Sequence, residues 1–451
     1  MAAFLYCLQL RDLTLAEGLE VIDEAAFYNC EALAALTVPS SVQFIGYAAF
    51  AYCSNNKQVI FNGDNLELDD FVFYDNMAME QLELPHSLTA IGEATFCGCR
   101  SLSAVTIPSA MKRVGPAAFA GCGNLQRVDI AGLKSWLGIS FLDGDANPLT
   151  IAHHLYVGGE EVTEVVIPAG VETIGKCAFS GGSSLTGVTF PSSVKSLGES
   201  AFKGCTSLQR VNAADVKSWF TISFTNDLSN PLNFARHLYV GGEEVNNVIV
   251  PSGVTRISDY AMVNCESVTA LTVPDEVTSI GNNAFYCCGN LAAVTVGDGV
   301  KTIGDRAFST CTSLGTVSLG TGLELLGSRV FSSSMQISSI TVKAMLPPKM
   351  TSKDAFASSV YKKATLKVPQ EALDDYRSTQ YWSNFANCEA IVSNVLLGDV
   401  NLDGEITISD VNAEIQAMYS GNDCEPLFDI NGDGEINIAD VNAIIDLIMS
   451  R

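Results

Sequence analysis

The sequence predicts an α/β-type repeat solenoid, with a parallel β-sheet and 23 residues per coil, followed by a small all-α module. Three observations predict this: a 23-residue period in Phe and Pro, two inserts that match each other, and two matching acidic loops near the end of the chain. From Leu271 to Leu291 one coil reads as a short strand, a Pro-led turn and an Ala-Phe step. Such a coil cannot bury its own apolar face, so neighbouring coils must stack on it.

One phenylalanine position recurs in almost every coil. Its members are Phe4, Phe27, Phe50, Phe73, Phe96, Phe119, Phe179, Phe202, Phe285, Phe308 and Phe331, with Met262 substituting once. Three residues further on, a cysteine recurs as Cys7, Cys30, Cys53, Cys99, Cys122, Cys205, Cys265, Cys288 and Cys311. Because free cysteine is among the most buried residue types, we interpret this series as a ladder of packed thiols. Neighbouring thiols could approach bonding distance, so the pattern leaves their redox state open. A line of thiols does not converge on one tetrahedral metal.

Two inserts enlarge the repeat at residues 128–162 and 211–245, and they match each other at an offset of 83. Each contains a Lys-Ser-Trp sequence, with Trp136 and Trp219, and ends in Tyr-Val-Gly-Gly-Glu-Glu-Val. The Gly-Gly pair supplies the positive φ of a two-residue hairpin turn. The two tryptophans either pack the enlarged coil on its neighbour or stand out as ligand platforms, and we favour packing.

Composition excludes several functions. The net charge of −25 argues against nucleic-acid binding, which needs clustered Lys and Arg. No apolar run is long enough to span a membrane. The sequence has no G-x-S-x-G, H-E-x-x-H or Walker motif, and His154 and His237 hold equivalent places in the inserts, so we assign them a structural role. We predict no active site.

The acidic loops carry the clearest chemistry. Residues 397–451 hold 12 acidic residues and one basic residue. A twelve-residue calcium loop takes oxygens from positions 1, 3, 5, 7, 9 and 12 and needs Gly at position 6, here Gly404 and Gly434. We expect two Ca²⁺ ions, bound by Asp399, Asn401, Asp403, Thr407, Asp410 and the carbonyl of Glu405, and by Asp429, Asn431, Asp433, Asn437, Asp440 and the carbonyl of Glu435. Position 12 is Asp in place of the usual Glu, and a helix follows each loop but none leads into the first.

The exposed side of the repeat strand is the candidate binding surface of the solenoid. Its middle position is Thr14, Thr37, Thr106, Thr189, Thr272, Thr295, Thr341 and Ser318, with Glu83, Val166 and Ile249 as exceptions. Simple strand propensity explains such a row of β-branched residues. The functional interpretation is a flat, hydroxyl-lined face for a protein or glycan partner, and the lack of aromatic residues in this set argues against sugar stacking there.

The coil resembles the bacterial BspA-like leucine-rich repeat, C-x-x-L-x-x-V-x-I-P-x-x-V-x-x-I-G-x-x-A-F, over about residues 4–340. We expect repeats over 1–338 and a C-terminal cap and connector over 339–395, where Tyr376, Tyr381, Trp382 and Phe385 would cover the last coil. The resemblance implies a secreted or cell-surface protein that adheres to other proteins. The chain starts inside a coil, so we expect either that an N-terminal portion, with or without an export signal, is missing or that the sequence was cut at this point.

Residues 396–451 resemble a type I dockerin, an EF-hand-like module that calcium folds and that plugs into a cohesin domain of a scaffold or surface protein. In that family loop positions 10 and 11 and the helix faces make the contact, which here implies Ile408, Ser409, Ile438 and Ala439. The apolar residues among these four differ from the hydroxyl pairs of some cellulosomal dockerins. The near equivalence of the two halves permits two binding orientations.

Together these features predict a non-catalytic binding or adhesion protein, located outside the cell or on its surface. The dockerin resemblance links it to complexes for polysaccharide catabolism. The alternative is an enzyme or enzyme accessory of a glycan-degrading complex, and a third reading is a passive spacer. Turnover of a polysaccharide would separate the enzyme from the binding protein.

Overall fold

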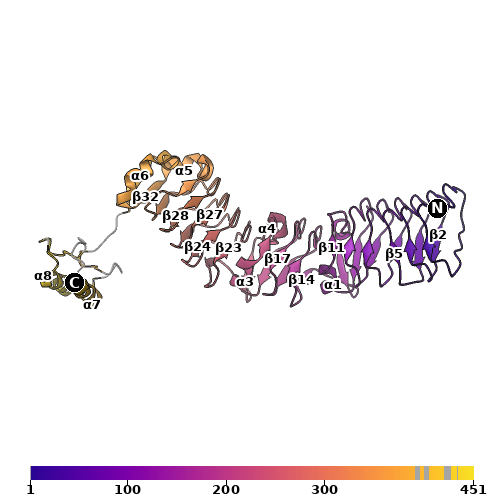
Figure 1. The fold of residues 1–451 in the computed structure, drawn as a ribbon, viewed down its shortest axis with the longest axis horizontal. Coiled ribbons are helices and arrows are strands. Elements are labelled where there is room, and N and C mark those ends of the chain that lie inside the picture. The colour runs from indigo at the N-terminus through magenta and orange to yellow at the C-terminus, as the bar shows by residue number, and fades with distance from the viewer. Residues whose placement is uncertain (1, 392–396, 401–405, 421–427, 434, 451) are drawn as a thin grey trace. The chain divides into compact units, whose positions relative to one another are not determined.

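The computed structural model describes residues 2–391, 397–400, 406–420, 428–433 and 435–450. The chain forms two compact units, unit 1 (Met1–Glu389) and unit 2 (Ala390–Arg451). In unit 1 the coils stack one on the next from the indigo to the orange part of the ribbon (Figure 1). The predicted repeat solenoid is confirmed, because successive strands pair in parallel with partners 23 residues apart, as in Thr272 with Thr295.

A first row contains the longer strand of each coil, in three separate sheets. Its strands are β2 (Ala35–Val38), β4 (Gln58–Phe61), β6 (Gln81–Glu83), β8 (Ala104–Ile107), β10 (Arg127–Ile130), β12 (Leu155–Val157) and β13 (Glu160–Glu161); β14 (Glu164–Val166), β16 (Gly187–Phe190), β18 (Arg210–Ala213), β20 (Leu238–Val240) and β21 (Glu243–Glu244); and β22 (Asn247–Ile249), β24 (Ala270–Val273), β26 (Ala293–Val296), β28 (Thr316–Leu319), β30 (Ser339–Val342), β32 (Thr365–Val368) and β33 (Asn387–Ala390).

A second row contains a two-residue strand from each coil, again in separate parallel sheets. Its strands are β1 (Val21–Ile22), β3 (Phe44–Ile45) and β5 (Glu67–Leu68); β7 (Ala90–Ile91), β9 (Arg113–Val114) and β11 (Ser140–Phe141); β15 (Thr173–Ile174), β17 (Ser196–Leu197) and β19 (Ser223–Phe224); and β23 (Arg256–Ile257), β25 (Ser279–Ile280), β27 (Thr302–Ile303), β29 (Leu325–Leu326) and β31 (Lys349–Met350).

Both rows are interrupted at each insert. The predicted hairpins form as antiparallel pairs, β12 with β13 and β20 with β21, and each ends its sheet. Gly158 and Gly159 have φ of 58° and 88°, the left-handed conformation that a two-residue turn of this kind needs. Short helices fill the rest of the inserts: α1 (Leu133–Leu137), α2 (Leu149–Ala152), α3 (Val216–Thr221) and α4 (Leu232–Ala235).

Side-chain hydrogen bonds connect the coils across each interruption. Trp136 is 1% exposed, and its indole N–H donates to the carbonyl of Ala178 at 2.9 Å. Trp219 repeats the contact with Ala261 at 2.9 Å. The packing interpretation of both tryptophans is therefore confirmed. A buried side chain, Asn147, also donates to Ala178, at 3.3 Å.

The phenylalanine and cysteine positions form two buried ladders. Consecutive phenylalanine rings stack with centroids 5.1 Å apart for Phe27 and Phe50, and 5.6 Å for Phe96 and Phe119. The thiol of Cys205 donates to the carbonyl of Phe179, 26 residues earlier, at 3.1 Å. Equivalent thiol bonds are made by Cys30, Cys53, Cys99, Cys122, Cys288 and Cys311.

The ladder position selects a small hydrogen-bond donor, and cysteine is one of several residues that meet this need. Where cysteine is absent, Asn76 donates to the carbonyl of Phe50 at 2.8 Å and Ser334 donates to that of Phe308 at 2.9 Å. Every cysteine in the described part of the chain is a free thiol. Burial raises the pKa of Cys53 to about 12, so this thiol is unreactive at neutral pH.

The last coils of unit 1 depart from the regular repeat. Beyond β30 the chain adds α5 (Ser358–Lys363) and α6 (Leu373–Ser378), which lie at the orange end of the stack (Figure 1). Tyr376 and Trp382 are buried, and Trp382 donates to the carbonyl of Pro348 at 2.7 Å. Phe385 packs edge-on against Phe356, and Tyr381 is partly buried against the same core.

Unit 2 contains α7 (Ile408–Ser420) and α8 (Ile438–Met449), each following one acidic loop. A small apolar core joins them, with Val400, Ile406, Val411, Ile430, Val441 and Ile444 buried. The amphipathic faces of two short helices cannot supply a large core, so this unit depends on other interactions for its stability.

Candidate functional site

The first acidic loop is described only at its two ends. Asp399 is 2% exposed and Asp410 is fully buried. The backbone N–H of Thr407 donates to Oδ2 of Asp410 at 2.8 Å, and this bond turns the position-12 carboxylate back toward the loop. The predicted ligands Asn401, Asp403 and Glu405 lie outside the described residues.

The second acidic loop is folded by its own carboxylates. Asp433 N–H donates to Oδ1 of Asp429 at 3.0 Å and to Oδ1 of Asn431 at 2.8 Å. Asn431 N–H donates to Oδ1 of Asp440 at 3.1 Å, while Asn437 N–H donates to Oδ2 of the same carboxylate at 2.9 Å. The side-chain oxygens of positions 1, 3 and 12 thus accept backbone N–H groups of the same loop. A loop that surrounds one hard cation takes oxygens from these positions.

The donor set suits calcium in its chemistry. The side chains are carboxylates and amides, the oxygen ligands that Ca²⁺ takes, and the Asp440 side chain is buried. Among the described residues no group of three His, Cys, Asp or Glu side chains lies close enough to hold a metal on its own. Asn431, Asn437 and the Glu435 carbonyl would therefore have to complete the second site. Asn437 also begins α8, where its Oδ1 accepts the Ala439 N–H at 2.8 Å.

The positions implied in cohesin contact lie at the first turns of α7 and α8. Ile408 is 67% exposed and Ile438 is 62% exposed, and their neighbours Ser409 and Ala439 are exposed too. Ile406, at position 8 of the first loop, is buried, whereas its counterpart Ile436 is only half-buried. Each helix therefore begins with one exposed isoleucine, and the two isoleucines hold equivalent places.

The predicted hydroxyl row lies on the first strand row of unit 1. Thr272, Thr295 and Ser318 are adjacent in register on β24, β26 and β28. The expectation that this row lacks aromatic residues was wrong. Tyr156 pairs in register with Asp129, and Tyr239 pairs with Asn212, so each hairpin places a tyrosine in the row. Sequence reasoning identified these tyrosines as hairpin residues but missed that the hairpin strand continues the repeat.

Arg127 covers the first of these tyrosines. Its guanidinium lies 4.0 Å from the centroid of the Tyr156 ring and holds Asp129 through two bonds, of 2.6 and 2.7 Å. The equivalent Arg210 instead pairs with Glu164, at 3.0 Å. The two inserts thus share a backbone but present different charged side chains around their tyrosines.

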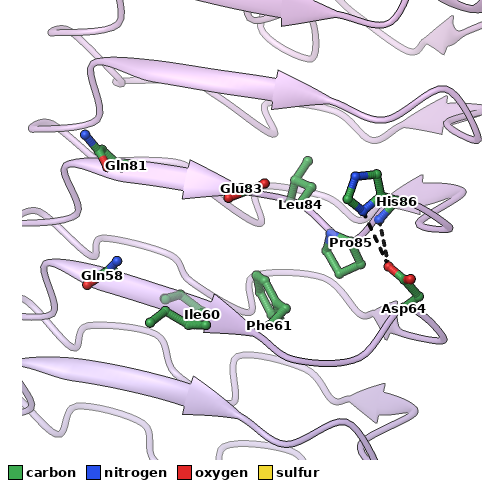
Figure 2. A pocket seen from close by; sticks show the side chains of 10 residues that line it. Gln58, Ile60, Phe61, Asp64, Gln81, Glu83, Leu84, Pro85 and His86 are labelled. Carbon is green, nitrogen blue, oxygen red and sulfur yellow. Dashed lines mark hydrogen bonds and ion pairs between the residues drawn. The ribbon is translucent and has the colours of Figure 1, made fainter.

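A shallow hollow of about 160 Å³ lies on the same strand row between β4 and β6 (Figure 2). Ile60 and Glu83 take the places of threonine here, and Ile60 is 44% exposed. At the rim His86 lies 3.7 Å from a carboxylate oxygen of Asp64, and both side chains are largely exposed. An exposed pair of this kind is a weak surface contact.

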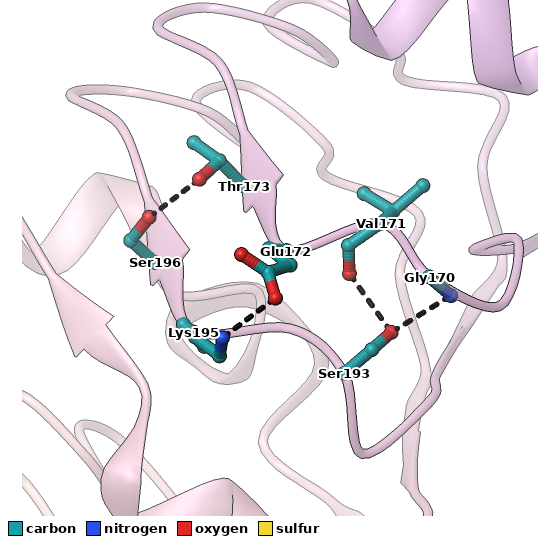
Figure 3. Close-up of polar contacts among 7 residues, drawn as sticks. All are labelled: Gly170, Val171, Glu172, Thr173, Ser193, Lys195 and Ser196. Carbon is teal, nitrogen blue, oxygen red and sulfur yellow. Dashed lines mark hydrogen bonds and ion pairs between the residues drawn. The ribbon is translucent and has the colours of Figure 1, made fainter.

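The other polar side chains of the repeats connect neighbouring coils. Figure 3 shows one example, in which Lys195 pairs with Glu172 at 2.6 Å and Thr173 bonds Ser196 at 3.0 Å, both across one repeat. The insert histidines instead bond within their own hairpins: His154 bonds Glu161 at 2.7 Å, and His237 bonds Glu244 at 2.6 Å. These contacts support the structural role that the sequence predicts for the histidines.

Stacked coils with parallel strands and a 23-residue period define a leucine-rich-repeat solenoid, here joined to a module of acidic loops and helices. The family model for the BspA type leucine-rich repeat region matches residues 1–126, 150–238 and 233–362 in six copies. The model for the dockerin type I domain matches residues 397–449. The chain therefore belongs to the BspA-type leucine-rich-repeat family and ends in a type I dockerin domain.

Several solved structures resemble the chain in fold. A leucine-rich repeat protein from Bacteroides ovatus is 22% identical over 82% of this chain and 87% of its own, with a TM-score of 0.38. A leucine-rich cell surface protein from Faecalibacterium prausnitzii is 20% identical over 89% and 88%, with a TM-score of 0.35. A leucine-rich repeat protein from Eubacterium ventriosum is 21% identical over 72% and 76%, with a TM-score of 0.35. No curated protein matches the chain.

Both families consist of non-catalytic binding domains, so the chain is built from modules that bind. Type I dockerins bind calcium, and their partner is a cohesin domain. Proteins with either module are typically secreted or bound to the cell surface. Among the described helices none is long and apolar enough to cross a membrane.

Proposed function

We propose that this protein is a non-catalytic adhesion subunit of an extracellular complex. The dockerin in unit 2, folded by two Ca²⁺ ions, docks to a cohesin of a scaffold or surface protein, and the solenoid in unit 1 presents a surface to a second partner. The observation that carries the proposal is the pairing of a repeat solenoid with a dockerin in one chain. The solenoid partner is a protein or a glycan, and the complex serves polysaccharide catabolism.

Calcium is expected to fold unit 2 alone. Its core is small and its loops concentrate negative charge, whereas unit 1 has one continuous apolar core from Ile22 to Phe385. A ligand that binds only the folded state stabilises it by about 2.7 kcal/mol at 100 times its Kd. EDTA should therefore abolish the helical signal of unit 2 and leave the unfolding of unit 1 unchanged.

Variants separate this effect from general chelation. The double variant Asp399→Ala with Asp429→Ala should lack the helical signal of unit 2 even without EDTA. Calorimetric titration of the parent protein with Ca²⁺ should find two bound ions. Asp446→Ala removes an exposed carboxylate of α8 outside the loops and serves as the matched control. Joint shifts of both unfolding transitions, or a single bound ion, would contradict the proposal.

Docking is expected to use Ile408 and Ile438 in two alternative orientations. Their exposure at equivalent helix starts supports this, since exposed apolar anchors are what a partner surface covers. Ile408→Asp or Ile438→Asp alone should leave calcium-dependent binding to a cohesin panel, and the double variant should lose it. Met449→Asp changes an exposed residue at the far end of α8 and should bind normally.

The strand row is the proposed contact surface of the solenoid. Thr272→Arg with Thr295→Arg should reduce capture of a partner from the cell-surface fraction of the parent organism. Thr321→Arg, on the turn after β28, should not. If captured material is unchanged in the row variant, the row is not the contact surface. Any turnover of a polysaccharide panel by the purified protein would contradict the non-catalytic role.

A further inference from the structure

An aromatic cluster stands on the flank of the first coils, away from both strand rows. It consists of Tyr28, Tyr47, Tyr52, Phe71 and Tyr74, here called the flank cluster. Tyr28 and Tyr52 lie 5.2 Å apart between ring centroids, and Tyr52 and Tyr74 lie 5.3 Å apart. Phe71 lies 5.5 Å from Tyr47 and 5.6 Å from Tyr74. The repeat does not require rings at these positions, because most later coils hold other residue types there, with Tyr260 and Tyr286 as exceptions.

The backbone at this flank favours other residues. The position two residues after the ladder phenylalanine has positive φ, and it is Gly98 with φ of 79° and Gly121 with φ of 74° in later coils. In the flank cluster the same position is Tyr52, with φ of 61°, and Phe71 has φ of 60° two residues before its ladder phenylalanine. Bulky side chains are disfavoured in this conformation. The same two positions hold Gly98 and Ala94 in one later coil, and Tyr6 and Tyr260 elsewhere in the stack, so the backbone accepts rings at them but does not require them.

The rings line an open hollow of about 350 Å³, and only Ala48 and Ala51 complete its lining. Neighbouring rings are tilted against each other, by 63° for Tyr28 and Tyr52 and by 50° for Tyr47 and Phe71. A tilted set does not form the flat platform on which a sugar ring stacks. It presents several π faces and edges around one space, which is the arrangement that encloses an organic cation.

The surrounding charge favours a cation as well. Residues 1–80 contain 12 acidic and two basic residues, and one of the basic side chains, Lys57, lies 3.7 Å from Glu80. Burial raises the pKa of the Tyr52 hydroxyl, and the neighbouring Tyr74 and Asp75 raise this pKa further. Asp75 is thus close enough to Tyr52 to act on it electrostatically. The Tyr52 hydroxyl therefore stays neutral at physiological pH, while the net charge of the surrounding residues is negative.

We propose that the flank cluster is a binding site for an alkylated ammonium group. The positive charge lies over the tyrosine and phenylalanine rings, and the alkyl groups cover Ala48 and Ala51. The same group occurs on free quaternary ammonium compounds and on methylated lysine side chains of proteins, and the site recognises this shared chemistry. The site involves neither the strand row nor unit 2, so it goes beyond the function proposed above.

The test is calorimetric titration of the calcium-loaded full chain with tetramethylammonium and, separately, with a trimethyllysine peptide. Neopentyl alcohol serves as the neutral probe of similar shape. We expect saturable binding of both cations with Kd on the order of 1 mM and no saturable heat from the alcohol. If tetramethylammonium binds more tightly, the natural ligand is a free quaternary ammonium compound. If the trimethyllysine peptide binds more tightly, the ligand is a methylated lysine of a protein.

Variants assign the binding to the cluster. Tyr52→Leu and Phe71→Leu should each weaken binding by about three- to thirtyfold, and Tyr52→Phe should retain it. Tyr286→Leu is the matched control, since Tyr286 follows a ladder phenylalanine as Tyr28 and Tyr74 do but lies far along the stack. Circular dichroism checks that each variant is folded. Equal binding of the neutral alcohol, no saturation below about 20 mM, or equal loss in Tyr286→Leu would overturn the proposal. None of these outcomes involves a cohesin, so the docking proposal is judged separately.

Discussion

Asn230 connects two stretches of the solenoid, and replacing it tests how the interrupted coils are held together. Its side chain is fully buried; Nδ2 donates to the carbonyls of Tyr260 at 2.8 Å and Ala261 at 3.1 Å. Oδ1 accepts the N–H of Leu232 at 2.9 Å. Asn230→Asp keeps the shape of the side chain but replaces its two donor hydrogens with an oxygen that faces two carbonyl oxygens.

The cost follows from the options open to the new carboxyl group. It can regain one donor by taking up a proton, which at pH 7 costs about 4 kcal/mol for a group whose unperturbed pKa is 3.9. The second donor is lost in either case, for about 1 kcal/mol. The free energy of unfolding should therefore fall by about 4–5 kcal/mol at pH 7. Because the folded-state pKa is raised, the deficit should shrink to about 1 kcal/mol as pH falls to 4.

Denaturant unfolding followed by circular dichroism measures this difference at pH 7 and pH 4. Asn147→Asp, at the first insert, should behave in the same way, because Asn147 donates to Cys177 at 2.7 Å and Ala178 at 3.3 Å. Asn246→Asp is the control, since that side chain is exposed. Coils contact only their neighbours, so the loss should appear as an earlier transition in part of unit 1. If Asn230→Asp unfolds together with Asn246→Asp at pH 7, the inserts are held by something other than these bonds.

Three further predictions concern the ladders and the dockerin core. Phe96→Ala should cost about 3–5 kcal/mol in denaturant unfolding, because a fully buried ring stacked on both sides is removed; a cost below 1 kcal/mol would contradict the ladder. Cys205→Ser should unfold within about 1 kcal/mol of the parent, as Ser334 already makes the equivalent bond, whereas Cys205→Val should be less stable than Cys205→Ser. Glu414→Ile should raise the melting temperature of calcium-loaded unit 2, because Glu414 is buried with neither carboxylate oxygen bonded and its counterpart in α8 is Ile444. Burial raises the pKa of Glu414 to about 7, so its carboxyl stays protonated in the folded state below that pH, and the gain should be larger at pH 8 than at pH 5; an equal gain at both would argue against a buried charge.

The repeat architecture could be predicted because the same physical requirement recurs in every coil of the sequence. Each coil must bury the same face against the next, so residues such as Phe96 and Cys99 recur at one period. The dockerin could be predicted equally well, because its acidic loops place oxygen-bearing residues at fixed positions, as from Asp429 to Asp440. The matching inserts were visible as a duplication, and their hairpins as Gly-Gly turns.

The tertiary structure decided what no local pattern specifies. Only the stacked coils show that a ladder thiol bonds the carbonyl 26 residues earlier, which explains why Asn76 and Ser334 can replace cysteine. Only the strand register places Tyr156 and Tyr239 in the hydroxyl row, and only the folded flank brings Tyr28, Tyr52 and Tyr74 around one hollow. The period and the residue types show which repeat positions are buried, because each buried position holds apolar or small residues in coil after coil. Which side chains meet is determined by stacking, since their contacts join residues one or more coils apart.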